Sequence, residues 1–272
     1  MREAAVTAAV RANSLGVSLA TLYYKRKMPQ KDEALRRDIE RVLRDHPSYG
    51  HKRLAIHLGV NKKRVRRVMR LFGMHPYRRR GRKYRRVKPQ NERYPNLLQL
   101  VTPAYEGCVW AADFTHLGYK GSDVSVATVL DLFSRKVVGV AIATRHGASL
   151  VIQAFANALL SNGRPVIFHS DNGSEYHARA FRTLLTNLGV SISRSAPGCP
   201  WENGYQESFY NQFKIDLGDP NRFSSFGELV AAIYETIYHY NTVRIHSALR
   251  MSPNQFARLH AGVTMNTSRD AL

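Results

Sequence analysis

Past residue 96 the apolar positions fall in short blocks that are rich in Val and Ala and are separated by turn signals. The first three blocks are typical of consecutive β-strands, and apolar helices alternate with strands after them. This order predicts an α/β fold in which a mixed sheet carries helices on its faces. Strands are predicted over 108–119, 122–133, 136–144, 165–171 and 190–196, and helices over 149–163, 178–189 and in two further segments that close the chain.

From about residue 31 to residue 75 the apolar positions instead recur at three- and four-residue steps, as in amphipathic helices. HPSYGHKR, residues 46–53, breaks the pattern, and Gly59 with Asn61 opens a third helix. Helix, turn and basic helix in this order predict an all-α helix-turn-helix region that binds DNA. On the third helix Val65, Val68, Met69 and Phe72 are expected to face inward. Upstream, residues 16–27 resemble the tail of another such unit.

The third helix carries six basic residues and no acidic residue. An ordinary solvated helix in a small bundle mixes the two signs, whereas the neutralisation of phosphates requires a dense set of cations. The pattern therefore favours DNA contact over a solvated face. The residues expected to make this contact are Lys62, Lys63, Arg64, Arg66, Arg67 and Arg70.

The net charge of the chain is concentrated at the same end. The formal charge is +21, and residues 1–96 hold 27 Lys and Arg against 7 Asp and Glu, whereas residues 97–272 hold 14 against 13. Such a field attracts nucleic acid or an anionic membrane surface. No apolar helix face accompanies the arginines, and no apolar run approaches the roughly 18–20 residues of a membrane span. The N-terminus does not resemble a secretory signal, so we expect a bacterial cytoplasmic protein associated with the nucleoid.

Residues 76–95, PYRRRGRKYRRVKPQNERYP, combine three prolines with arginines interleaved with tyrosines. This composition is typical of an extended basic linker that follows a phosphate backbone and stacks its tyrosines on exposed bases. The alternative, a nuclear-targeting signal, requires a eukaryotic host. The cations expected to contact DNA here are Arg78, Arg79, Arg80 and Arg82.

Two aspartates occupy positions in the predicted sheet where a carboxylate is costly or functional. Strand alternation places Asp113 beside Ala111 and Thr115 on one face of an apolar strand, where an unpaired charge is unfavourable. Asp171 ends the strand PVIFHSD, at the edge where open α/β sheets place their chemistry. Each also has an ordinary explanation, because a strand aspartate often bonds to backbone and Asp-Asn-Gly is a turn signature.

A third acid lies on a helix predicted to start after Pro200. Its buried stripe is expected at Tyr205, Phe209, Phe213 and Leu217, and a neighbouring polar stripe at Asn203, Glu207, Asn211 and Lys214. An ordinary polar face is the usual explanation for a lone glutamate. Hard divalent ions, however, bind oxygen ligands, and two ions about 3.5–4 Å apart stabilise the attacking and leaving oxygens of a phosphodiester displacement. Three carboxylates from different elements would suit such a site, and Lys214 would hold a substrate phosphate.

The segments around these acids resemble a known set of motifs. WAADFT around Asp113, HSDNGSEY around Asp171 and WENGYQESFYNQFK around Glu207 are similar to the acidic motifs of retroviral-integrase-type transposases, specifically the insertion sequence 3 family. Between the second and third acids lie 35 residues, the spacing of that family, and Lys214 matches its basic residue seven positions after the glutamate. YNTVRIHSAL, residues 240–249, resembles the family's C-terminal signature, and HPSYGHKRL with RVRRVMRLFGM resembles its helix-turn-helix segment.

The resemblance, over roughly residues 15–258, implies an RNase H-like catalytic core in which Asp113, Asp171 and Glu207 bind two Mg²⁺ ions, with Mn²⁺ as a substitute. It implies a DDE transposase that cleaves the ends of its element and transfers strands without a covalent protein intermediate. The implied partners are double-stranded DNA of the terminal inverted repeats and of the target, and further copies of the chain on paired ends. Such elements usually encode an upstream frame with a leucine zipper. No sustained heptads occur here, so the chain resembles the second-frame product and the upstream product is an expected partner.

The expected organisation is a helical segment (1–30), a helix-turn-helix domain (31–75), a basic linker (76–95), a catalytic core (96–260) and a C-terminal tail (261–272). Two other functions are compatible with parts of this pattern. A non-catalytic DNA-binding repressor derived from a transposase has no use for three acids and Lys214. A nuclease acting on RNA–DNA hybrids does not need the basic N-terminal half.

Other polar residues have more than one interpretation. Glu202 is expected to cap a helix or face solvent, and Asp131 to be structural. Glu175 suits either a supporting position beside the site or the surface.

Three basic or titratable residues are similarly ambiguous. His169 suits either substrate contact or a satisfied core position, and Arg244 and His246 suit either DNA contact or a bridge between helices. Spacing alone does not separate these alternatives. Cys108 and Cys199 match no metal-ligand spacing.

Overall fold

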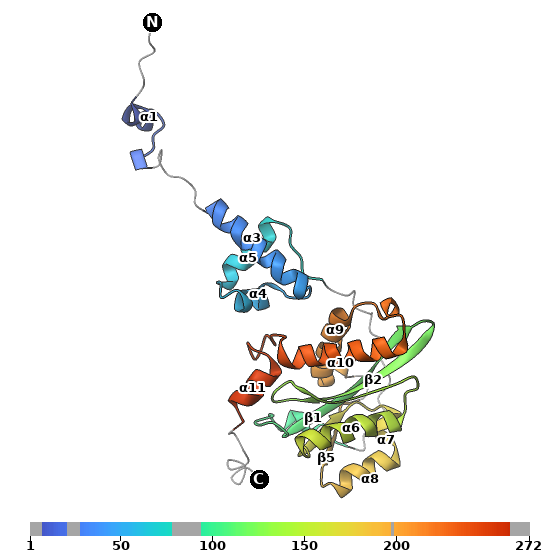
Figure 1. Cartoon of the computed structure of the whole chain (residues 1–272). Helices are drawn as coiled ribbons and strands as arrows, with labels where there is room; N and C mark the ends of the chain where they lie inside the picture. Colours follow the sequence, from blue (N-terminus) through green and yellow to red (C-terminus); the bar gives the residue numbers. More distant parts are fainter. Residues whose placement is uncertain (1–6, 21–27, 78–93, 197–198, 262–272) are drawn as a thin grey trace.

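The computed structural model describes residues 7–20, 28–77, 94–196 and 199–261. Figure 1 shows a group of helices from the first part of the chain and a sheet covered by helices on both faces. In chain order the elements are α1 (Ala8–Ser14), α3 (Met28–Asp45), α4 (His51–His57), α5 (Lys62–Leu71), β1 (Val109–Tyr119), β2 (Ser122–Asp131), β3 (Val137–Ala143), α6 (Ala148–Asn162), β4 (Ile167–Ser170), α7 (Ser174–His177), α8 (Arg179–Asn187), β5 (Ser191–Arg194), α9 (Gly204–Leu217), α10 (Phe226–Thr242) and α11 (Pro253–Leu259). Short 3-10 turns lie at Leu97–Gln99, Pro200–Asn203 and Pro220–Arg222.

Helices α3, α4 and α5 form a helical domain with a small apolar core of its own. Between α4 and α5, Gly59 has a φ of +63°, a left-handed conformation that favours glycine, and the Asn61 side chain caps α5 by accepting the Lys63 N–H at 2.8 Å. Val65, Val68 and Met69 are buried as predicted, but the prediction for Phe72 is wrong. Phe72 follows the last residue of α5 and is 38% exposed, with the Arg36 guanidinium 5.4 Å from its ring. The segment 21–27 of the predicted upstream unit lies outside the described residues.

The predicted mixed sheet is confirmed. Its five strands lie in the order β3-β2-β1-β4-β5, with β1 antiparallel to β2 and parallel to β4. One face packs on α9 and α10, and the other packs on α6, α7 and α8 (Figure 1). Ala111 lies in the first of these cores and Trp110 and Ala112 in the second, so the alternation along β1 directs Asp113 toward α9.

Within the described residues three α-helices follow β5, where two were predicted. The additional helix, α11, begins at Pro253 and has a capping box, in which Ser252 Oγ accepts the Gln255 N–H and Gln255 Oε1 accepts the Ser252 N–H. Its length of seven residues is too short for apolar periodicity to be recognised. The local indications of this helix were therefore the cap signal at Ser252 and the proline at its first position, Pro253.

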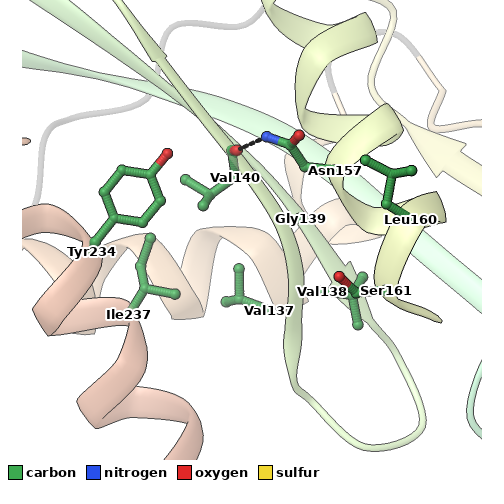
Figure 2. A pocket seen from close by; sticks show the side chains of 9 residues that line it. All are labelled: Val137, Val138, Gly139, Val140, Asn157, Leu160, Ser161, Tyr234 and Ile237. Carbon is green, nitrogen blue, oxygen red and sulfur yellow. Dashed lines mark hydrogen bonds between the residues drawn. The ribbon is translucent and has the colours of Figure 1, made fainter.

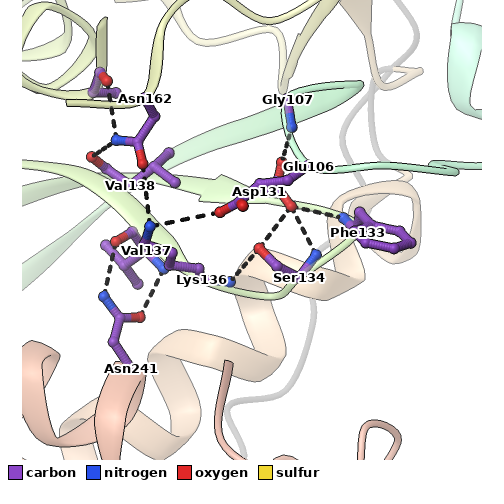
Figure 3. Close-up of polar contacts among 11 residues, drawn as sticks. Glu106, Gly107, Asp131, Phe133, Ser134, Lys136, Val137, Val138, Asn162 and Asn241 are labelled. Atoms are coloured by element: carbon purple, nitrogen blue, oxygen red, sulfur yellow. Dashed lines mark hydrogen bonds and ion pairs between the residues drawn. The ribbon is translucent and has the colours of Figure 1, made fainter. Parts of the chain in front are cut away.

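Asp131, at the end of β2, is structural as expected. It is fully buried, and Oδ1 accepts hydrogen bonds from Ser134 N at 2.7 Å and Ser134 Oγ at 2.8 Å, while Oδ2 accepts one from Gly107 N at 2.8 Å (Figure 3). Nearby, the Asn241 side chain bonds both the N–H and the C=O of Val137, at 2.9 Å each. The two Asn241 bonds satisfy backbone groups of β3, which is an edge strand of the described sheet.

Strand β3 and helix α6 approach each other closely at Gly139. A Cβ at this position would lie 2.2 Å from the Ala154 carbonyl oxygen and 2.7 Å from the Ala158 Cβ. A pocket opens beside this contact between β3, α6 and α10, and Figure 2 shows the Asn157 amide at its rim donating to the Val140 carbonyl at 2.9 Å. None of the residues that line it is a predicted site residue, so the pocket is not the candidate active site.

Gly139→Ala should lower the free energy of unfolding by about 2–3 kcal/mol, because helix backbone rather than a movable side chain occupies the space. The matched control is Gly118→Ala on β1, where nothing lies within 4 Å of the added Cβ. Urea unfolding followed by circular dichroism measures both. Equal stability of the two variants would show that α6 can move away from the sheet without cost.

Candidate active site

Parallel pairing of β1 with β4 brings the two aspartates to neighbouring positions. The register ends with Ala112 opposite Ser170, so Asp113 and Asp171 each follow the last paired residue of their strands. Asp113 Oδ1 accepts the Phe114 N–H at 2.8 Å, and Asp171 Oδ1 accepts the Gly173 N–H at 2.9 Å. Both side chains are half-buried, at the carboxyl end of β4. The parallel register therefore brings the two aspartates to the same end of neighbouring strands.

Helix α9 is attached to the same place through two buried polar side chains. Gln206 is fully buried, and its Nε2 donates to the Ala111 carbonyl of β1 at 2.6 Å. One turn later, the Tyr210 hydroxyl donates to the Asp113 carbonyl at 2.6 Å and accepts from Thr128 Oγ1 of β2 at 2.9 Å. Burial raises the pKa of Tyr210 well above its usual value, so the hydroxyl keeps the proton that it donates. These bonds fix α9 across β1 and β2.

Glu207 directly follows Gln206, in the first turn of α9, and its side chain is exposed. Lys214, half-buried, lies two turns further along the same helix. The predicted buried stripe holds at Phe209, Phe213 and Leu217 but is wrong at Tyr205, which is 44% exposed. There the Arg135 guanidinium stacks 3.9 Å from the ring, because the helix has only just begun at Gly204.

The charges of these residues act on one another. The pKa of Asp113 is raised to about 7, first by burial and then by the negative charge of Asp171, and Glu207 adds to the rise. The Phe114 N–H and the positive charge of Lys214 act in the opposite direction. The pKa of Asp113 on β1 thus responds to charges on the end of another strand and on helix α9.

The pKa of Asp171 is also raised, mainly by burial. The Gly173 N–H and the charge of Arg194 oppose this rise, and Glu175 increases it. Arg194 is 2% exposed, with one guanidinium nitrogen bonded to Ser170 Oγ and the other donating to the Tyr176 carbonyl at 2.8 Å. A buried cation thus holds the chain on both sides of Asp171.

The donor set fits a hard divalent cation. Asp113, Asp171 and Glu207 offer only oxygen ligands, and the like charge around Asp113 is the condition that a bound cation relieves. In the described parts of the chain no three Asp, Glu, His or Cys side chains already stand as a metal-binding group.

The other acids and His169 have supporting contacts. Both ring nitrogens of His169 are bonded, Nδ1 to Ser193 Oγ at 2.8 Å and Nε2 to Ser195 Oγ at 3.0 Å, and the residue is fully buried. His169 is therefore a satisfied core histidine. Glu202 accepts the Ala196 N–H at 2.6 Å and ties the chain before α9 to β5. Glu175 lies beside Asp171 and pairs with His146 at 3.5 Å, which is the supporting position of the two expected for it.

The cations of α5 divide into two groups. Lys62, Lys63, Arg66 and Arg70 are exposed. Arg67 is exposed as well, but it forms a two-pronged ion pair with buried Asp32, at 2.6 and 2.7 Å, and half-buried Arg64 donates to the Lys31 carbonyl at 3.1 Å. The latter two therefore have a role in holding α5 on α3. Arg78, Arg79, Arg80 and Arg82 lie outside the described residues.

For Arg244 the prediction of DNA contact is wrong. The side chain is 2% exposed and its guanidinium is held by Asp216 of α9 at 2.6 Å and by Ser48 Oγ at 2.9 Å, which leaves no surface for a phosphate. His246 is half-buried, and its pKa is lowered to about 4, chiefly by burial. It is therefore neutral at pH 7 and brings no charge to DNA. The alternative, a bridge between elements, describes Arg244.

Sequence reasoning missed Gln206, Tyr210 and Arg194. The first two lie four residues apart, adjoining Phe209 and Phe213, so the helical period would have placed them on the buried face. A buried polar residue on that face needs a partner, and this was the available signal. Arg194 had no comparable signal, because a cation near the end of a strand is ordinarily exposed.

Comparison with known proteins agrees with this architecture. Two family models, both described as integrase core domain, match residues 105–200 and 188–253. The chain is 31% identical over 251 residues to the transposase for insertion sequence element IS904 of Lactococcus lactis subsp. lactis (strain IL1403), which covers 86% of this chain and 98% of that protein. It is 34% identical over 151 residues to transposase InsF for insertion sequence IS3A of Escherichia coli (strain K12), covering 54% of this chain and 52% of that protein.

Among solved structures, a chain of the simian T-cell lymphotropic virus intasome in complex with PP2A regulatory subunit B56 gamma aligns with a TM-score of 0.51. The alignment covers 77% of this chain and 70% of that chain at 20% identity, so the likeness concerns the fold. The predicted RNase H-like core is confirmed. No helix in the described ranges has the length and apolar character needed to cross a bilayer.

Asp113→Asn should stabilise the metal-free protein above pH 7, by about 1–3 kcal/mol. The folded pKa of Asp113 lies above its unfolded value, so charging this carboxyl weakens the fold as pH rises from about 4 to 7. The gain in the variant should accordingly shrink as pH is lowered toward 4. Urea unfolding at pH 8 and pH 5 measures it. Asp131→Asn is the control and should destabilise, because both carboxylate oxygens accept hydrogen bonds and the variant replaces one of them with an NH2 donor; a destabilised Asp113→Asn at pH 8 would contradict the repulsion.

Proposed function

Because the chain belongs to the insertion sequence 3 family of DNA transposases and carries an integrase core, we propose that it cleaves the ends of its element and joins them to target DNA by a metal-dependent DDE reaction. The observation that carries the proposal is that Asp171 and Glu207 both act on the carboxyl of Asp113. Asp113, Asp171 and Glu207 come from a central strand, a strand end and a helix, and the pKa of Asp113 responds to both of the others.

In this proposal the three carboxylates hold two divalent ions, Mg²⁺ or Mn²⁺. The bound ions would polarise the scissile phosphodiester and activate the attacking hydroxyl, first of water and then of a DNA 3′ end. The protein residues keep the ligands in place. The Phe114 N–H orients the Asp113 carboxylate, the Gly173 N–H orients that of Asp171, and Arg194 supports the backbone beneath Asp171.

Lys214 is assigned to the substrate phosphate. Its positive charge already lowers the pKa of Asp113, so a phosphate bound beside it would lie next to the acids. Gln206 and Tyr210 keep α9 at a constant position relative to β1, and so keep Glu207 and Lys214 on the same side as Asp113. The proposed reaction requires no covalent bond between DNA and protein.

Recognition of the element ends is assigned to the helical domain, through Lys62, Lys63, Arg66 and Arg70 of α5. These four exposed cations share one helix and can neutralise successive phosphates. We further propose that the protein acts at the nucleoid as a homo-oligomer on paired ends, with the upstream-frame product as a partner. A repressor that only binds DNA is the second candidate function, and the cleavage assay separates the two.

Asp113→Asn, Asp171→Asn and Glu207→Gln should each lower cleavage of a labelled element end by about a thousandfold or more, because each removes a ligand of the ions. DNA affinity should stay within about twofold of the wild type. Cleavage by the wild type should require Mg²⁺ or Mn²⁺ and fail with Ca²⁺. Glu235→Gln on the exposed face of α10 is the control and should cut normally. Undiminished cutting by any of the three acid variants would reject its role.

Replacement of Lys62, Lys63, Arg66 and Arg70 by Ser should weaken DNA binding and reduce the slope of log K against log salt by about 0.9 for each phosphate that the variant no longer neutralises. Fluorescence anisotropy across a salt series gives this slope. Arg179→Ser, on an exposed turn of α8, serves as the matched control. A slope equal to that of the wild type would place the phosphate contacts elsewhere.

A further inference from the structure

Two segments that are distant in sequence meet between the helical domain and the core. The first is the turn between α3 and α4 with the start of α4, and it contributes Ser48, Tyr49 and Arg53; the second is the segment after α10, with Arg244 and Ile245. Gln212 and Asp216 of α9 complete the contact. We refer to these seven residues as the interdomain joint.

Arg244 is the centre of the joint. Its guanidinium donates to Asp216 Oδ2 at 2.6 Å and to Ser48 Oγ at 2.9 Å, also bonds Gln212 Oε1, and lies 5.5 Å from the Tyr49 ring centre. Ser48 Oγ donates in turn to Asp216 Oδ1 at 3.3 Å. A buried cation with partners on both domains resists separation, because parting them would leave its charge unpaired.

The remaining contacts are equally directional. The Ile245 N–H donates to the Tyr49 hydroxyl at 3.0 Å, and Arg53 Nε donates to the Ile245 carbonyl at 2.9 Å. Both backbone groups of Ile245 are therefore bonded by side chains of the helical domain. The Ile245 side chain also packs against the apolar core of that domain. Polar and apolar contacts thus specify one orientation of the two parts.

The joint is connected to the candidate active site through α9. Gln212 and Asp216 lie in the second half of the helix that carries Glu207 in its first turn. The opposite end of the connection is α5, whose cations are assigned to DNA and whose Val65 and Val68 share an apolar core with Tyr49. Packed and hydrogen-bonded residues therefore connect α5, to which DNA binding is assigned, with α9, which carries Glu207.

We propose that the interdomain joint sets the distance along DNA between the bound terminal repeat and the phosphate that is cut. The joint holds α5 and α9 at one separation, through directional bonds that join the two domains. This inference rests on the proposed function, since it concerns where the acids meet the DNA.

The test maps which nucleotides lie beside α9 without requiring catalysis. An iron chelate that generates hydroxyl radicals is attached to the cysteine of Ser208→Cys, next to Glu207, in full-length protein that also carries Cys199→Ser; the other cysteine, Cys108, is buried. The probe is a duplex bearing an end of the element and its flanking DNA. The expected result is strand scission confined to a few adjacent nucleotides.

Ser48→Ala with Tyr49→Phe removes hydrogen bonds of the joint while keeping the Tyr49 ring in the core of the helical domain. In this variant radical scission should spread over at least about twice as many nucleotides as in the protein with an intact joint. The affinity for the duplex should stay within about twofold of that protein's affinity. The control is Tyr119→Phe, which removes a hydroxyl contact to the Phe223 carbonyl inside the core and should leave the pattern unchanged. Lengthening of segment 78–93 by eight Gly and Ser residues should also leave it unchanged.

A pattern that stays confined in the Ser48→Ala, Tyr49→Phe variant, or that moves when segment 78–93 is lengthened, overturns the proposal. If the double variant no longer binds the duplex, Gln212→Leu, on the core side of the joint, takes its place. Its radical scission should also spread, and scission that stays confined overturns the proposal. Strand cleavage in Mg²⁺ is measured separately. If the wild type fails to cleave while its radical scission is confined and that of the joint variants is broad, this outcome rejects the catalytic proposal and supports the role of the joint.

Discussion

The position of the third acid depends on buried hydrogen bonds between α9 and the central strand. Gln206 reaches the Ala111 carbonyl and Tyr210 reaches the Asp113 carbonyl, so the helix is attached at one level of the sheet. Apolar packing alone would tolerate a shift of the helix along the strand, because apolar contacts are not directional. A buried amide or hydroxyl that lost its partner would be costly, which excludes such a shift. The register of Glu207 against Asp113 follows from this constraint, and with it the composition of the candidate site.

The site holds negative charges together in the fold. The pKa of Asp113 is raised to about 7 by burial and by Asp171, and that of Asp171 is raised by burial. Their cost is offset by the surrounding scaffold, including the buried Arg194 and the two cores on either face of the sheet. A local conflict of charge inside an otherwise consistent structure is typical of functional sites. It also explains why a cation, rather than further protein contacts, is the natural complement of these residues.

Residues from segments that resemble family signatures stabilise the structure of this chain. Arg244 belongs to the segment that resembles the family's C-terminal signature, yet it is buried and binds Asp216 of α9 and Ser48 of the helical domain. Tyr49, from the segment that resembles the N-terminal signature, accepts the Ile245 N–H. Two signatures at opposite ends of the chain therefore form one contact. Arg67 gives a similar lesson on a smaller scale, because buried Asp32 takes up its guanidinium within the helical domain.

The sequence by itself determined the order of strands and helices, the separation of the basic end from the nearly neutral core, and the three acids with their spacing. These features are local, since periodicity, turn residues and charge are properties of neighbouring positions. Only the tertiary structure decided that α11 exists as a third closing helix, that Phe72 and Tyr205 are exposed, and that Arg244 is buried. It also selected Gln206 and Tyr210 as the residues that attach α9. Each of these outcomes depends on partners from distant segments, and burial or pairing with a distant partner leaves no periodic mark on the residues nearby.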